Sequence, residues 1–224
     1  TGLTLKMGSF KAGLINTTVD IKNLKLFNPP GFKDRLMIDM PRIYVDYDLP
    51  AIIKGKIHLT ELRLNLREFI VVKNEKGELN INALKVVQAE KKREKPAAIG
   101  KGKMPEIEID SLELKIGKAV YRDYSSGVLH EEEFDLGIDE KYSNITDVYS
   151  LVSLVVVRSL YKTSIARLSG FDLGGLEGTL SDTLGTAQKV AGGAAGEVAK
   201  GAGDAVSKTA GALTDIFKDT LGSH

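Results

Sequence analysis

Apolar and polar residues alternate along much of the first two thirds of the chain, and one alternating stretch occurs twice. The stretch from Ile57 to Gly77 reads IHLTELRLNLREFIVVKNEKG, and the stretch from Ile107 to Gly127 reads IEIDSLELKIGKAVYRDYSSG. The two align without a gap when the first is moved forward by 50 positions, the difference between 57 and 107. Alternation with a period of two is typical of a strand with one buried and one solvated face. The sequence therefore predicts a duplicated β unit.

The aligned apolar residues predict the inner face of both strands. They are Ile57, Leu59, Leu62, Leu64 and Leu66 in the first copy and Ile107, Ile109, Leu112, Leu114 and Ile116 in the second. Their parity changes part-way along each copy, at Thr60 or Glu61 in the first and at Asp110 and Ser111 in the second. One extra residue keeps each set on one face, which predicts a β-bulge. Both copies end in a polar turn that contains glycine, and each turn predicts a hairpin.

Further strands and a helical turn are predicted before the first copy. Residues 1–27 read as two strands with a parity shift near Asn23, and residues 36–49 read as another strand. The loop at 28–32 contains two consecutive prolines, which lack the amide donor that a ladder requires. Residues 50–55 predict a single helical turn stopped by glycine.

Two helices are predicted among the later residues. Asn80 or Asn82 is expected to cap a helix that runs to about Lys95. Thr146, followed by an aspartate, is expected to cap a helix that runs to about Ala166. The centre of this second helix is apolar nearly all round, and such a helix is normally buried.

The composition changes abruptly at Gly170 to alanine, glycine, lysine and aspartate. Apolar residues recur there every eleven positions, which predicts a long and nearly straight amphipathic helix. Its apolar stripe consists of Leu180, Leu184, Ala191, Ala195, Ala202, Val206, Leu213 and Phe217. Several internal glycines make this helix weak alone, so it is expected to lie on a surface.

Together these patterns predict an α+β fold in two parts. Residues 1–169 form a β-rich domain with a linker near 96–105, and residues 170–224 form the helical tail. The expected architecture is a curved, mainly antiparallel β-sheet built from a duplicated strand-hairpin unit, with packed helices and a long C-terminal amphipathic helix.

Composition and charge exclude several classes of function and of binding site. A formal net charge of +1, from 31 basic and 30 acidic residues, provides no global field for binding nucleic acid. The sequence has no cysteine, which excludes disulfides and thiolate metal sites. The three histidines, His58, His130 and His224, are too scattered to suggest a histidine cluster. Carboxylates such as Asp46 and Asp48 are interpreted as solvent-exposed residues on strand faces. No catalytic, cofactor-binding or metal-binding residue is predicted, and an enzyme is not expected.

A series of short motifs covers about the first 85 residues. They are an Ile-x-Asn-Leu strand at 21–24, an Asn-Pro-x-Gly-Phe loop at 28–32, a strand with a turn at 43–55, the long strand at 57–77 and an Asn-x-Asn-x-Leu segment at 80–84. In order and spacing they resemble the N-terminal region of the AsmA-like family of bacterial envelope proteins. The glycine- and alanine-rich tail lies outside that family pattern.

The resemblance implies a non-enzymatic protein of the bacterial cell envelope. Such a protein binds or transports lipid, or supports outer-membrane maintenance, through an apolar curved sheet. The implied location is the periplasm, with an N-terminal signal or membrane anchor that is absent from this chain, which starts at Thr1. The implied partner is phospholipid or a membrane surface.

Two alternatives stay open from the sequence. The apolar strand faces either form an ordinary packed core closed by helices or line an open groove that holds acyl chains. The second function class is a structural or assembly protein whose C-terminal helix mediates oligomerisation or partner binding. For that helix, contact with protein is favoured over a membrane surface, because its alanine-rich centre has little apolar area to bury.

Overall fold

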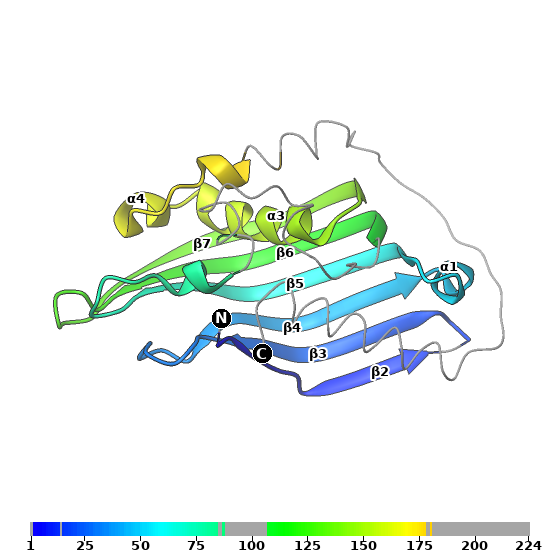
Figure 1. Cartoon of the computed structure of the whole chain (residues 1–224), viewed down its shortest axis with the longest axis horizontal. Coiled ribbons are helices and arrows are strands. Elements are labelled where there is room, and N and C mark those ends of the chain that lie inside the picture. Colours follow the sequence, from blue (N-terminus) through cyan, green and yellow to red (C-terminus); the bar gives the residue numbers. More distant parts are fainter. Residues whose placement is uncertain (1, 14, 85–86, 88–106, 178–179, 181–224) are drawn as a thin grey trace.

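Seven strands form one open sheet in the part of the chain that the structure, a computed structural model, describes. That part comprises residues 2–13, 15–84, 87, 107–177 and 180. The strands are β1 (Thr4–Lys6), β2 (Ser9–Gly13), β3 (Thr18–Phe27), β4 (Leu36–Tyr47), β5 (Ile57–Lys73), β6 (Ile107–Asp123) and β7 (His130–Ile145). Their order is β1-β3-β4-β5-β6-β7, and β2 also pairs with β3 (Figure 1). All pairs are antiparallel except β5 with β6, so the prediction of a mainly antiparallel sheet is confirmed.

The two copies of the repeated stretch are β5 and β6, and they lie side by side. They pair in parallel with one register, from Ile57 with Ile107 to Lys73 with Asp123, so each residue faces the one 50 positions later. The second copy turns back into β7 as a hairpin. After the turn of the first copy, the described residues form a single antiparallel bridge, Lys73 with Leu79. Two strands that pair in parallel cannot be joined by a hairpin alone and need a crossover connection.

Two lines of backbone irregularity cross the sheet, and the first confirms the predicted bulge. Thr60 is the extra residue where the β4–β5 register shifts between Asp46 and Tyr47. The same line reaches the edge strand β7 at Asn144, whose φ is 57°. The bulge keeps the apolar residues of β5 on one face although their parity changes.

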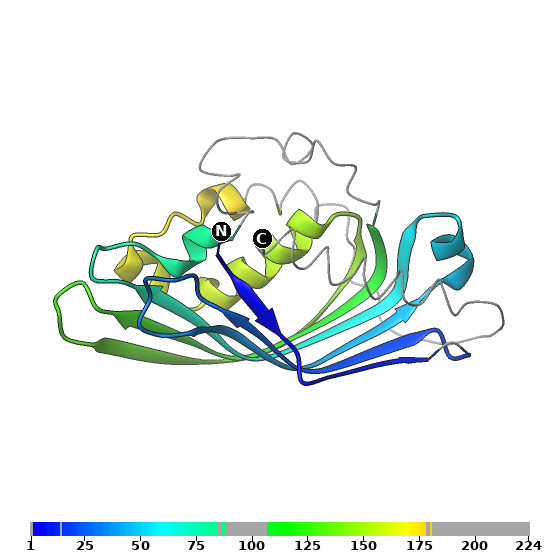
Figure 2. The ribbon, with the colours of Figure 1, turned by 60° about the horizontal axis from the view of Figure 1, so that its bottom comes forward.

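The second line runs through the middle of the sheet. Asn23 in β3 has a φ of 52°, where a parity shift is predicted, and Gly137 in β7 has a φ of 55°. Between them, a Cβ added to Gly117 of β6 would lie 2.7 Å from the carbonyl oxygen of Arg67 in β5. Only glycine permits so close an approach of two backbones. Bulges and kinks bend strands, and the sheet is concave on one side (Figure 2).

Helices lie on the concave face, over β6 and β7 (Figure 2). The principal one is α3 (Val148–Tyr161), followed by α4 (Ile165–Ser169). Asp147 caps α3, because its Oδ1 accepts a 2.7 Å hydrogen bond from Ser150 N. The predicted cap, Thr146, is wrong by one residue, and the predicted single helix to about Ala166 is divided into two.

Shorter helices follow β4 and β5. The predicted helical turn before the first copy is α1 (Leu49–Ile53), which Asp48 caps. The predicted helix from Asn80 is the 3-10 helix η1 (Asn80–Ala83) in the described residues, without a side-chain cap. The remainder of that helix, apart from the buried Val87, and the linker at 96–105 lie outside the described residues.

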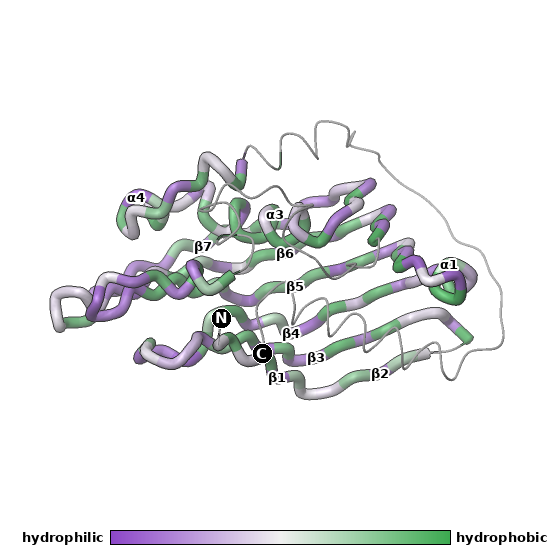
Figure 3. Tube along the Cα trace, in the orientation of Figure 1, coloured by the Kyte–Doolittle hydropathy of each residue, from purple (hydrophilic) through white to green (hydrophobic). Residues whose placement is uncertain are grey.

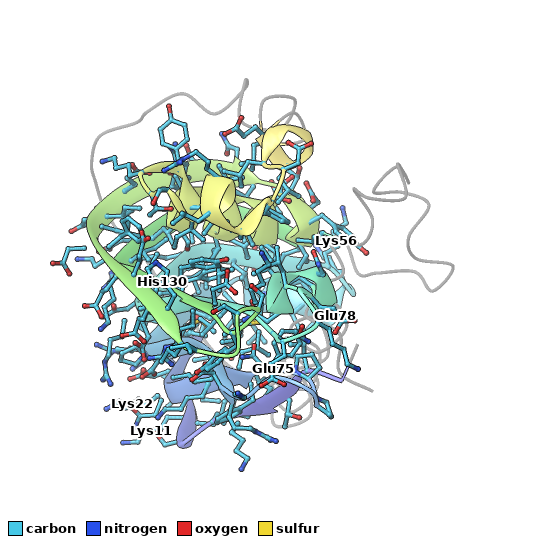
Figure 4. The ribbon with its side chains drawn as sticks, turned by 90° about the vertical axis from the view of Figure 1, so that its left-hand side faces the viewer. Lys11, Lys22, Lys56, Glu75, Glu78 and His130 are labelled. Atoms are coloured by element: carbon cyan, nitrogen blue, oxygen red, sulfur yellow. The ribbon has the colours of Figure 1, made fainter. Side chains whose placement is uncertain are left out.

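One hydrophobic core fills the concave side of the sheet, and a smaller cluster lies on the convex side. Hydrophobic and hydrophilic residues alternate along the strands (Figure 3). The inward ones meet α3 and α4 in the main core. The smaller cluster consists of Ile70, Val72 and Val120, with Phe32 and Tyr124 packed against it. Elsewhere on the convex face, charged side chains such as Lys11 and Lys22 project outward (Figure 4).

Candidate functional site

The structure places the ten apolar residues predicted on the repeated strands on one continuous concave surface. They are Ile57, Leu59, Leu62, Leu64 and Leu66 on β5 and Ile107, Ile109, Leu112, Leu114 and Ile116 on β6. None has more than 6% of its surface exposed. The parallel register puts each of the five side by side with its counterpart.

The predicted tail stripe falls almost entirely outside the described residues. Leu180 is described and is buried in the main core. The remaining members of the stripe are Leu184, Ala191, Ala195, Ala202, Val206, Leu213 and Phe217. The helix predicted for residues 170–224 therefore stays a prediction.

A cavity of about 50 Å³ lies between the concave face and α3. Its sheet wall comprises Ile38, Met40, Val45, Leu59, Leu62, Leu64, Leu66, Phe69 and Ile107. Its other wall comprises Leu84 and the α3 residues Val148, Leu151, Val152, Val155 and Val156. All these side chains are apolar, and the volume is several times what one water needs. A lining of this composition offers no hydrogen-bond partner to water and favours apolar groups.

Polar contacts hold α3 over the cavity at both ends. Asp147 caps the first turn, as described above. Near the other end, Arg158 Nε donates a 2.6 Å hydrogen bond to Tyr142 Oη and lies 3.1 Å from Glu140 Oε2. The Tyr142 hydroxyl in turn donates to Glu140. Burial, and then the contact with Glu140, raise the pKa of Tyr142, so its hydroxyl remains a donor at neutral pH.

A second polar cluster surrounds His58 on the convex face, where β5 and β6 begin. His58 Nδ1 lies 3.2 Å from Asp48 Oδ2, and Nε2 lies 3.0 Å from both carboxylate oxygens of Asp110. Asp48 Oδ1 accepts a 3.2 Å hydrogen bond from Ala51 N at the start of α1. Glu108 is the residue directly opposite His58 in the β5–β6 register. The hydrogen bond with Asp110 raises the pKa of His58 against the effect of desolvation, with help from Asp48.

Sequence reasoning missed this cluster. The three histidines are far apart in the sequence, and Asp48 fits the pattern of a solvent-exposed strand face there. The available signal was the 50-residue register of the repeat, which puts His58 opposite Glu108 and next to Asp110.

Comparison of the chain with known protein families, with curated proteins and with solved structures finds no match. Within the described ranges, no helix combines the length and the apolar character that crossing a membrane requires.

Proposed function

We propose that this protein is a non-enzymatic component of the bacterial cell envelope that binds lipid, with an acyl chain held between the concave sheet face and α3. The observation that carries the proposal is the cavity of about 50 Å³ between these elements, whose described walls are apolar throughout. Each methylene group moved from water into such a space contributes about 0.8 kcal/mol. The resemblance to AsmA-like proteins and a periplasmic location, with an anchor upstream, belong to the same proposal.

Binding a whole acyl chain requires α3 to move away from the sheet. The cavity is smaller than the roughly 300–1,000 Å³ typical of ligand pockets. Val148, Leu151 and Val155 on α3 meet the sheet through apolar contacts. A lipid chain inserted between the two layers would replace these contacts with similar ones, so the exchange costs little in desolvation.

Two finer features complete the proposal. β5 and β6 arose by duplication of one strand unit, which their constant register and the matching parity changes support. The amphipathic helix within 170–224 lies against protein, and the burial of Leu180, its first stripe residue, supports a location beside the main core.

Native mass spectrometry of the full chain, purified from a bacterial host, tests lipid binding. We expect a phospholipid or fatty acid to co-purify and to be extractable with organic solvent. Val152→Phe fills the cavity from α3 and should reduce the bound fraction several-fold, because the added ring takes the space of the ligand. The matched control is Val128→Phe at an exposed position. Absence of bound lipid, or equal binding in both variants, would contradict the proposal.

The alternative is a structural or assembly protein whose C-terminal helix mediates oligomerisation. The buried Leu180 shows that the chain is still in contact with the core where the predicted stripe begins. Sedimentation of the full chain beside a version that ends after Leu180 distinguishes the two functions. A concentration-dependent oligomer of the full chain alone supports assembly, whereas two identical monomers exclude it.

A further inference from the structure

The imidazole of His58 faces negatively charged acceptors on both of its nitrogens. Asp48 Oδ2 lies 3.2 Å from Nδ1, and both carboxylate oxygens of Asp110 lie 3.0 Å from Nε2. A neutral imidazole carries one N–H group, so it can donate to one of these carboxylates only. The other nitrogen presents a lone pair, and a second proton or a metal ion must lie between it and the carboxylate.

Asp48 determines which nitrogen is available. Its carboxylate is fixed by capping α1, where Oδ1 accepts from Ala51 N at 3.2 Å. Histidines that bind metal ions usually donate their other ring N–H to a carboxylate, which fixes the tautomer and the ring orientation. With Nδ1–H directed at Asp48, the lone pair of Nε2 points toward β6.

β6 supplies two further ligand groups at this point. Glu108 is the register partner of His58, and Asp110 follows two residues later on the same face. One ligand atom from each of these three side chains lies within 4.8 Å of the other two. Two atoms bound to one tetrahedral zinc ion are about 3.4 Å apart, so Nε2 and Asp110 are already close to the required separation. The exposed side chain of Glu108 can complete the set by rotation.

The charge around His58 also favours a cation. Three carboxylates, those of Asp48, Glu108 and Asp110, surround one imidazole. Over the ranges that the structure describes, the ion pairs formed by Asp48 and Asp110 are both with His58, and no lysine or arginine pairs with Glu108. Even a protonated imidazole would leave an excess of negative charge, which a divalent ion would neutralise.

We propose that His58, Glu108 and Asp110 bind one divalent transition-metal ion of the zinc class, with Asp48 as the outer partner of the histidine. One nitrogen and two carboxylate oxygens, with water completing the shell, suit zinc, whereas calcium and magnesium prefer oxygen ligands alone. The ladder between β5 and β6 fixes the ligand backbones in advance. The ion links the ends of β5 and β6 directly and α1 through Asp48.

The experiment uses the full chain, freed of metal by a chelator and kept at slightly alkaline pH. Zinc binding is measured by calorimetry, and cobalt is used as a probe whose visible absorption reports four-coordinate geometry. We expect one equivalent of either ion to bind. Glu108→Gln should weaken binding at least about tenfold, Asp48→Asn should weaken it about 10–100-fold, and His58→Gln should abolish it. His130→Gln is the matched control, because His130 also contacts a carboxylate, Glu132 at 3.2 Å.

The alternative is that His58 serves only as an ion-pair partner of the two aspartates. In that case zinc shows no saturable binding, or binds equally to the parent protein, Glu108→Gln and His58→Gln, and either result overturns the proposal. Circular dichroism checks that each variant is folded. If His58→Gln does not fold, Glu108→Gln decides alone, since this glutamate takes no part in the ion pairs of His58.

Discussion

Asn80 donates a 2.9 Å hydrogen bond from Nδ2 to Asn28 Oδ1, across 52 residues of chain, in a site closed to solvent. Asn80 Nδ2 also donates to Ile70 O, and Asn80 Oδ1 accepts from Val72 N, both at 2.8 Å. Asn28 Nδ2 donates to Asp34 O at 2.8 Å. The two amides thus tie the loop between β3 and β4 to the far end of β5.

Asn80→Ala should therefore be strongly destabilising. The substitution leaves the buried amide N–H of Val72 and the Oδ1 atom of Asn28 without their hydrogen-bond partner, and each unsatisfied buried group costs about 1–3 kcal/mol. Urea unfolding should show a loss of about 2–4 kcal/mol. Asn65→Ala, at an exposed position of β5, should change stability by less than about 0.5 kcal/mol. Similar losses in the two variants would show that the buried amides contribute nothing specific.

Gly117→Ala tests the close approach of β5 and β6. The new Cβ would lie 2.7 Å from the Arg67 carbonyl oxygen, so the two strands must separate locally at a loss of about 1–3 kcal/mol. Gly127→Ala is the comparison, because it has a φ of 84° but no atom within 4 Å of the new Cβ. Its cost is the backbone strain of about 1 kcal/mol alone. Thermal unfolding of both variants would refute this prediction if Gly127→Ala were the more damaging change.

Tyr142→Phe should loosen α3. The variant loses the hydrogen bonds with Arg158 and Glu140 but keeps the ion pair between these two residues at 3.1 Å. We expect a modest loss of about 1 kcal/mol and faster amide hydrogen exchange in α3 than in β5. Tyr161→Phe, at an exposed position, is the control and should leave exchange unchanged. Amide hydrogen exchange that became equally faster over the whole sheet would instead indicate global destabilisation.

The lowered pKa of Asp123 should affect how the stability of the fold decreases in acid. Burial opposes ionisation of its carboxyl, but hydrogen bonds from Ser125 and Tyr121 and the charge of Lys73 outweigh burial and lower its pKa. A group whose pKa is lower in the folded protein stabilises it above the unfolded pKa of about 3.9, and this contribution is lost as pH falls through the folded pKa. Asp123→Asn should flatten the decline in stability over that acidic range in urea unfolding. An unchanged slope would contradict the assignment.

The strand faces could be predicted from the sequence because each depends on local alternation. The parity change at Thr60 is enough to locate a bulge, and the structure has it there. The path of the chain after the first copy is harder to predict. A polar turn that contains Gly77 is compatible with a hairpin or with a crossover, and the following Asn80 resembles a helix cap. The side chain of Asn80 instead forms a hydrogen bond with Asn28, which is too distant in sequence for a local pattern to reveal.

The helix start and the His58 cluster illustrate two different limits of prediction. Thr146 and Asp147 are adjacent capping residues, and only the structure shows that the carboxylate reaches Ser150 N. His58, Asp48 and Asp110 come together through strand pairing. The pattern of the repeat contains the register that joins them, but a parallel arrangement of the copies must be known before that register can be used.

The parallel register of β5 and β6 has a consequence for the order of folding. Every pair in this ladder closes a loop of the same length, so no pair is entropically easier to form first than another. The β6–β7 hairpin, in contrast, can grow outward from its turn by the shortest loops. We expect β1 to β5 and β6 to β7 to form as two early units whose joining is the slow step. The ladder between the two copies is then the last part of the sheet to form, although it is the longest ladder in the native sheet.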